Sequence, residues 1–190
     1  MVSALLLIIL SVLIILLVQA FLVAVIYNRL VTLKNRFKNA FALVDLQLRR
    51  RYDLIQHLVE AAKADHEALE DVVQARAQAV SAQMSLAGDP TQLSALGRLI
   101  EADGRLSAAL GRLLAGLEAR PELKADRLET KEEENRLAFA RQAYNDAVMF
   151  YNEAREKFPL VLFSEMFGFG LAELWPDDDP KAAPPPKVVF

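Results

Sequence analysis

The sequence predicts an all-α protein with a transmembrane helix at its amino-terminal end. Three observations predict this fold: an apolar run at residues 2–26, apolar side chains that recur at gaps of three and four residues, and the absence of Pro and Gly from residue 28 to residue 87. The chain has 190 residues and a formal net charge of −3. It contains no cysteine, which excludes disulfides, thiolate metal sites and cysteine catalysis.

The apolar run is long enough to span a bilayer. Only Ser3, Ser11 and Gln19 interrupt it, and a helix needs roughly 20 such residues to cross about 30 Å of hydrocarbon. The alternative is a cleaved signal peptide, but no basic side chain precedes the run, and the run is longer than the apolar core of such peptides. We therefore predict a transmembrane anchor over residues 1–27, in contact with the lipid bilayer.

The charged residues that follow the anchor predict its orientation. Four basic residues, Arg29, Lys34, Arg36 and Lys38, come before the first acidic residue, Asp45. Because basic flanks stay on the cytoplasmic side of a membrane, we expect an outside N-terminus and a cytoplasmic body. The same four residues form a predicted membrane-proximal group that faces anionic headgroups.

Residues 28–158 are predicted to form an antiparallel helical bundle. Its helices are expected at about 28–86, 90–119 and 127–158, and the first shows the regular apolar spacing of a coiled coil. The second helix would begin at Asp89-Pro90, a helix-capping residue followed by proline. A straight helix over residues 28–86 would reach roughly 90 Å from the bilayer.

The second predicted helix contains the tripeptide Gly-Arg-Leu three times, at intervals of seven residues. This period places Gly97, Gly104 and Gly111 in one row. Because each interior glycine costs about 1 kcal/mol against alanine, close approach of another helix is the natural compensation. We predict a helix-contact face here; the alternative is chance repetition in a helix rich in Ala, Leu, Gly and Arg.

The third predicted helix contains a different repeat, in which Tyr144-Asn145 recurs as Tyr151-Asn152. A polar residue within a helical interface can fix the register of its neighbours. One interpretation is that Asn145 and Asn152 make buried hydrogen bonds between helices. The other is that both amides are solvated and both tyrosines belong to the core or its rim.

The carboxyl end comprises a short apolar segment, residues 159–175, and a Pro-rich tail, residues 176–190. The apolar segment is too short to span a membrane. Three helices running out, part-way back and out again would leave Phe158 far from the bilayer, so we expect the segment to pack at the bundle tip or on a neighbouring subunit. The tail ends in five residues that we predict to insert into a partner as a clasp: Pro186, Lys187, Val188, Val189 and Phe190.

No motif of catalysis, cofactor binding or metal binding is present, and the only histidines are His57 and His66. We predict no catalytic, cofactor or metal site. In the basic run 49–51, one arginine must face inward, because successive helical residues point about 100° apart. The chain is mildly acidic, and its aromatic residues lie on the apolar stripe rather than among the arginines, so we expect no nucleic-acid partner.

The stretch from Tyr27 to Arg76 closely resembles the LemA family of bacterial membrane proteins. It contains the YN-LV-L-N-R opening, the D-QL-RRYDLI core and the HE pair, and the carboxyl half agrees through its Tyr-Asn repeat and its final Pro-Lys-Val. The resemblance implies one amino-terminal membrane helix, an antiparallel bundle and no established catalytic activity. Gln56-His57 replaces the usual Pro-Asn, which predicts a straighter first helix.

These observations favour a non-catalytic scaffold in the bacterial inner membrane that forms a homo-oligomer. The contact surfaces would be the first helix, the glycine row and the tail clasp. The alternative is an accessory protein that presents its cytoplasmic body to a membrane enzyme, a transporter or a signalling partner.

Overall fold

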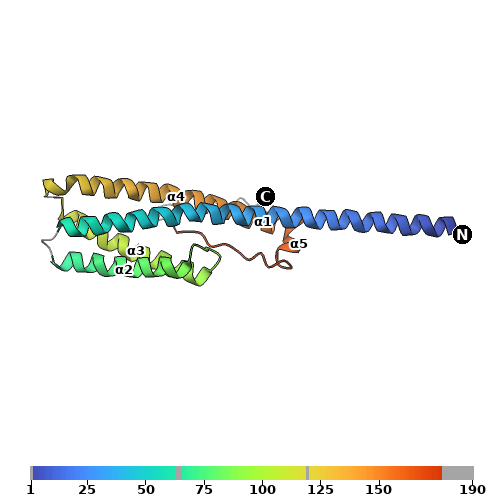
Figure 1. Ribbon diagram of the computed structural model, residues 1–190, viewed down its shortest axis with the longest axis horizontal. Helices are drawn as coiled ribbons and strands as arrows, with labels where there is room; N and C mark the ends of the chain where they lie inside the picture. Colours follow the sequence, from blue (N-terminus) through green and yellow to red (C-terminus); the bar gives the residue numbers. More distant parts are fainter. Residues whose placement is uncertain (1, 63–65, 119, 177–190) are drawn as a thin grey trace.

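The computed structural model describes residues 2–62, 66–118 and 120–176, and these residues contain helices and no strand, which confirms the all-α prediction. Successive long helices run in opposite directions and form an elongated bundle, from which the amino-terminal part of the first helix projects (Figure 1). In chain order the elements are α1 (Val2–Ala62), α2 (His66–Leu86), α3 (Leu93–Gly116), the 3-10 helix η1 (Pro121–Leu123), α4 (Lys124–Glu156) and α5 (Leu160–Ser164).

Helix α1 joins the apolar run to the bundle without a break. It has 61 residues, and its most apolar 18-residue window has a mean hydropathy of 3.2 with none of the window buried. This is compatible with the predicted anchor. The second half of α1 carries the predicted apolar stripe, of which Leu30, Phe37, Phe41, Val44, Leu48, Tyr52 and Ile55 are all buried. Helix α1 continues through Gln56-His57 without a break.

The structure shows that the prediction of one helix over residues 28–86 is wrong. Helix α1 ends at Ala62 and α2 begins at His66, and residues 63–65 lie outside the described residues. Val73 has the three- and four-residue apolar spacing predicted for residues 28–86 but is 51% exposed, whereas Val72 and Ala79 are buried. The buried face of α2 is therefore a different one. Packing α2 on α3 and α1 removes apolar surface from water that a single straight helix would expose.

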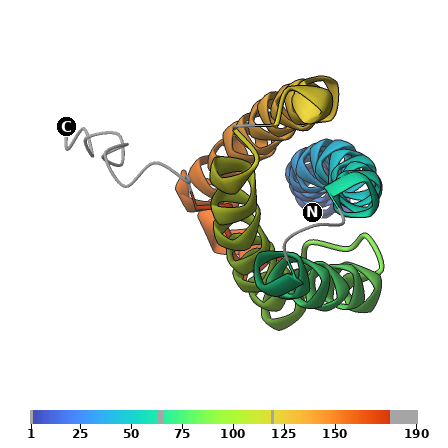
Figure 2. The ribbon, with the colours of Figure 1, turned by 90° about the vertical axis from the view of Figure 1, so that its left-hand side faces the viewer.

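The long helices surround one core. Seen end-on, α4, α3 and α2 form a curved row, and α1 lies against its hollow side (Figure 2). Helix α1 packs mainly along α4, and α2 packs mainly along α3. Helix α3 starts at Leu93 rather than at residue 90, because the Asp89 carboxylate accepts hydrogen bonds from the amide and hydroxyl of Thr91, at 3.1 and 2.8 Å, and holds residues 89–92 in a turn. Helix α4 begins close to its predicted position.

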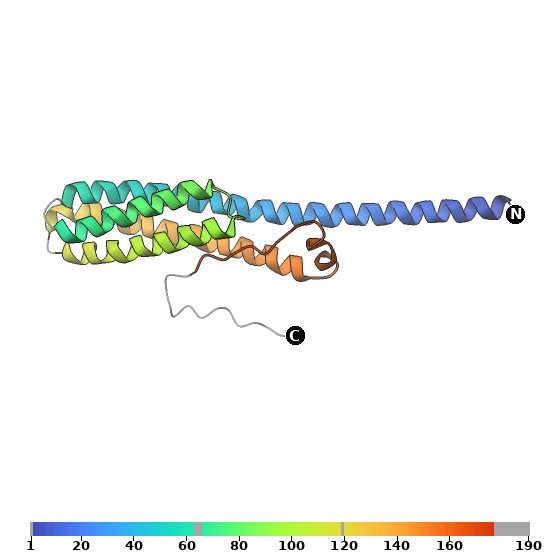
Figure 3. The ribbon, with the colours of Figure 1, turned by 90° about the horizontal axis from the view of Figure 1, so that it is seen from below.

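The extra reversal between α1 and α2 changes where the carboxyl end lies. Helix α4 runs back toward the apolar half of α1, and the chain after it lies beside α1 at that end of the bundle (Figure 3). The ring centroids of Phe167 and Phe169 lie 5.3 and 5.7 Å from that of Tyr27. The expectation that Phe158 and the apolar segment lie far from the anchor is therefore wrong, because it rested on one helical reversal too few.

Candidate functional site

The repeated Tyr-Asn pairs of α4 hold the backbone of residues 169–176, which run along α4 in the direction opposite to it. The Asn145 amide nitrogen donates to the carbonyl of Trp175 at 2.8 Å, and the Asn145 amide oxygen accepts from the Trp175 N–H at 2.8 Å. Asn152 makes the same pair of hydrogen bonds with Ala172, at 2.9 and 3.0 Å. Each asparagine thus satisfies both backbone groups of one residue, as a neighbouring strand would.

The two tyrosines extend this arrangement, which we call the Tyr-Asn clamp (Tyr144, Asn145, Tyr151 and Asn152). The Tyr144 hydroxyl donates to the carbonyl of Glu173 and the Tyr151 hydroxyl to that of Gly170, both at 2.8 Å. Burial raises the pKa of both phenols, so the hydroxyls remain donors.

The period of the repeat explains the register of the clamp. Members of the repeat are seven residues apart on α4, while their partners are three residues apart, since Asn152 and Asn145 bind Ala172 and Trp175. Seven helical residues advance about 10.5 Å, and three extended residues advance about 10 Å. The interpretation that the asparagines make hydrogen bonds between helices is therefore wrong in its partner, because both bond an extended segment.

We call residues 169–176 the clamped segment, and every third side chain of this segment faces the bundle. Phe169, Ala172 and Trp175 are buried, while the residues between them are exposed. On the other side of the clamp, Tyr151 packs on Phe37 and Tyr144 packs edge-on against Phe41, with ring centroids 5.0 and 5.5 Å apart. The clamp therefore joins α1, α4 and the clamped segment in one contact region.

Next to the clamp, a buried carboxylate is shared between three helices. Asp103 of α3 is 1% exposed and accepts a hydrogen bond from Arg51 of α1 at 2.7 Å. It also forms an ion pair with Arg141 of α4 and lies 3.3 Å from the Tyr52 hydroxyl. Burial, followed by the charge of Asp103, raises the pKa of Tyr52. The guanidinium of Arg141 in turn lies 4.9 Å from the centre of the Trp175 ring, which links this ion cluster to the clamped segment.

The ion cluster confirms that one arginine of the 49–51 run faces inward. Arg51 is 2% exposed and also bonds Ser107 at 2.8 Å and Glu134 at 3.3 Å. Arg49 remains on the surface in an ion pair with Asp45. Because two guanidinium groups surround one buried carboxylate, the arrangement is suited to fixing how α1, α3 and α4 meet.

The sequence interpretation did not single out Asp103 and Arg141, although a signal was present. Asp103 occupies a buried position in the run Leu96, Leu99, Asp103, Leu106 and Leu110, whose gaps are three and four residues. Arg141 is buried next to Ala140 of the α4 stripe, between Leu137 and Tyr144. A charged residue at such a position indicates a buried partner.

The glycine row lies on a part of α3 that no other described helix covers. A Cβ atom added to Gly97, Gly104 or Gly111 would find nothing within 4 Å among the described residues outside its own local chain. Gly104 and Gly111 line a groove of about 420 Å³, together with residues of α4. Close approach within this chain therefore does not account for the row, and contact with a second copy stays a prediction.

The basic residues predicted to be membrane-proximal lie on α1 directly after its apolar half. Lys34 lies 5.8 Å from the ring centre of Phe169, and Arg36 lies 5.6 Å from that of Phe150. Lys38 forms an ion pair with Asp89 at 3.2 Å, and Arg29 lines a surface groove with Arg36. The predicted tail clasp, residues 186–190, lies outside the described residues.

The sequence model of the LemA family matches residues 40–190, which include the ion cluster, the clamp and the clamped segment. The chain belongs to the LemA family. No curated protein matches this LemA-family chain significantly.

The clamp of this LemA-family chain predicts site-specific amide protection. We expect Asn145→Ala to speed hydrogen exchange at the Trp175 amide, and Asn152→Ala to do so at the Ala172 amide, because each substitution removes that amide's acceptor. A tenfold increase corresponds to about 1.4 kcal/mol, within the usual worth of a hydrogen bond. Asn135→Ala, at an exposed position of α4, serves as the control and should change neither amide. Equal exchange in all three variants would contradict the clamp.

Proposed function

We propose that the chain is a non-catalytic helical scaffold of the bacterial inner membrane, anchored by α1, with its body in the cytoplasm. The continuity of α1 supports the anchor, because one helix links an apolar stretch of spanning length to the bundle core. The basic residues directly after the apolar half support the orientation. The described polar clusters, the clamp and the ion cluster, bind other parts of this chain, which suits a structural role.

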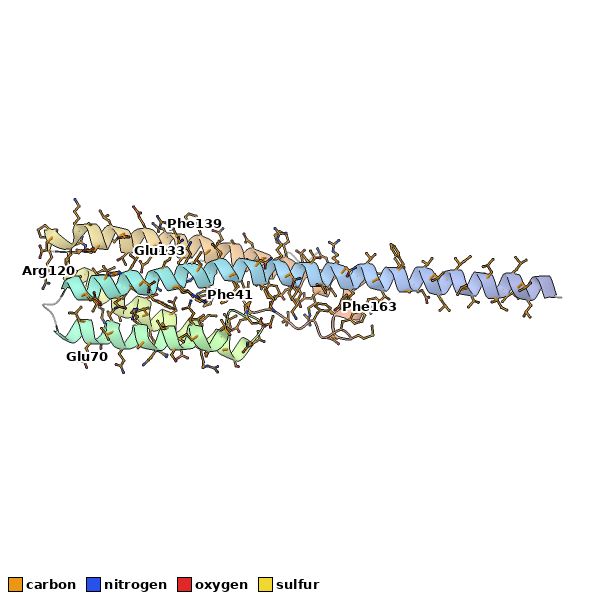
Figure 4. The ribbon with its side chains drawn as sticks, viewed as in Figure 1. Phe41, Glu70, Arg120, Glu133, Phe139 and Phe163 are labelled. Atoms are coloured by element: carbon orange, nitrogen blue, oxygen red, sulfur yellow. The ribbon has the colours of Figure 1, made fainter. Side chains whose placement is uncertain are left out.

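An apolar stripe on α4 is the observation that favours self-association. Leu128, Phe139 and Phe150 are 53%, 73% and 54% exposed, and they follow one another at intervals of eleven residues. Eleven residues complete just over three helical turns, so the three side chains share one face over roughly 33 Å. Phe139 points away from the bundle (Figure 4). Exposed Glu132 and Asp146 lie on the same face between them, so the stripe offers single large apolar contacts to a second copy rather than a continuous apolar patch.

The membrane restricts how two copies can meet through this stripe. Two anchored copies share their orientation, so a two-fold axis along the membrane normal would place α4 parallel to its partner. Each Phe139 would then lie close to the same residue of the second copy. The glycine row and the tail clasp are further proposed contacts.

The test combines a charge substitution with cross-linking in the full chain, purified in mild detergent. We expect Phe139→Glu to weaken the oligomer at least tenfold by mass photometry, because a carboxylate would replace an apolar side chain at the centre of the contact. Met84→Glu is the matched control, since Met84 is 75% exposed on α2. In the cysteine-free chain, Phe139→Cys should form a disulfide with its counterpart, and Met84→Cys should not.

A wild-type chain that is monomeric at all accessible concentrations would overturn self-association. It would favour the alternative of an accessory protein that presents the same α4 stripe to a membrane enzyme, a transporter or a signalling partner. Oligomers that persist in Phe139→Glu but are lost when residues 186–190 are removed would place the contact at the tail rather than on α4.

A further inference from the structure

A second apolar surface lies at the end of the bundle nearest the apolar half of α1. Four of its side chains are exposed: Phe158 at 80%, Val161 at 41%, Leu162 at 63% and Met166 at 64%. We call these four residues the apolar tip. They belong to α5 and its two flanking turns, and nothing else in the described residues covers them.

The tip is attached firmly to α1 by aromatic contacts. Phe163 stacks on Phe167 with ring centroids 6.1 Å apart, and Phe167 packs edge-on against Tyr27 at 5.3 Å. Phe163 lies beside α1 at the end of the bundle from which the apolar half projects (Figure 4). On α1, Ile26 and Leu30 are buried at the same level. The tip is therefore level with the last turn of the apolar run.

Basic side chains border one side of the tip. Arg29 and Arg36 of α1 and Lys157 of α4 line one surface groove of about 610 Å³ together with Glu153, which pairs with Lys157, and Phe158 belongs to the wall of the same groove. Apolar side chains bordered by Lys and Arg are the pattern of segments that lie in the membrane interface, where the apolar groups enter the acyl boundary and the cations meet phosphates.

We propose that the apolar tip inserts into the headgroup interface of the leaflet nearest the bundle, where α1 emerges from the membrane. This inference rests on the proposed anchor, because the position of the tip follows from where the apolar half of α1 lies. The bilayer would then contact the protein at two places, the spanning helix and the tip. A second contact prevents the bundle from rotating freely about the axis of α1.

Single cysteines in the full chain can test this, since the sequence has no other cysteine. Leu162→Cys and Met166→Cys report on the tip, Leu16→Cys on the anchor, and Met84→Cys on an exposed position of α2. Each variant carries an environment-sensitive fluorophore and is reconstituted into vesicles of phosphatidylcholine and phosphatidylglycerol, with and without spin-labelled lipids that quench at known depths.

We expect quenching at Leu16, Leu162 and Met166 and none at Met84. The tip positions should respond most to the shallow quencher and Leu16 to the deep one. If Leu16 is quenched while Leu162 or Met166 behaves like Met84, the tip proposal is wrong and the anchor stands. If Leu16 is not quenched, the anchor itself is wrong. A tip label that is shielded from water but not quenched by lipid would indicate cover by a second copy and would also overturn the proposal.

Discussion

Replacing Asp103 with alanine is expected to lower the free energy of unfolding by about 3–5 kcal/mol, because removing one partner of a buried ion cluster leaves uncompensated charge in the core. Arg51 is 2% exposed and Arg141 is 8% exposed, so water cannot readily replace the lost carboxylate. The measurement is urea unfolding of the full chain in detergent, followed by far-ultraviolet circular dichroism.

Glu101→Ala provides the matched control on the same helix. Its ion pair with Arg105 has the same i,i+4 geometry as many surface pairs, and its two side chains are 51% and 72% exposed. Such a pair contributes at most about 1 kcal/mol. A triple variant, Arg51→Met, Asp103→Leu and Arg141→Met, should recover much of the stability lost in Asp103→Ala, because it removes the buried charges together. An Asp103→Ala variant as stable as Glu101→Ala would contradict this account.

Truncating Trp175 to alanine should release the clamped segment without unfolding the helices. Trp175 is 3% exposed, and truncating a buried tryptophan to alanine costs about 3–5 kcal/mol of stability. That loss is large for a short segment that is held at one edge of the bundle by the clamp and three buried side chains. Limited proteolysis should therefore cut within residues 169–176 much faster in Trp175→Ala than in the wild type, while helicity stays the same.

The neighbouring residue gives the control for this experiment. Leu174 is also apolar but is 44% exposed, so Leu174→Ala should leave the cleavage rate almost unchanged. If Trp175→Ala instead lowers the unfolding midpoint of the whole bundle, the segment unfolds together with the helices. The expectation that it is released separately is then wrong.

Much of the fold was predictable from local pattern, and the exception has a physical reason. The stripe from Leu30 to Ile55 follows helical spacing, and burial confirms it. The end of α1 at Ala62 was not predictable in this way, because no Gly or Pro marks it and both sides continue a helical pattern. The chain reverses because α2 is buried against α3, and this contact joins residues that are far apart in the sequence.

Only the α4 side of the Tyr-Asn clamp was predictable from the sequence. The Tyr-Asn repeat is visible as a period of seven, and its importance for register was inferred from that period. Its partner is the backbone of residues 169–176, which has no side-chain signature apart from Phe169, Ala172 and Trp175 at intervals of three. Hydrogen bonds to main-chain groups depend on position rather than on residue type, so composition could not indicate them.

The uninterrupted α1 also has a mechanical consequence. Its part within the bundle, residues 27–62, is roughly 50 Å long and is locked to α4 along its length. With no proline to act as a hinge, α1 would transmit a change in the tilt of the proposed anchor to the bundle as a lever does. A tilt of about 5° would move the far end of the bundle by roughly 4–5 Å over that length.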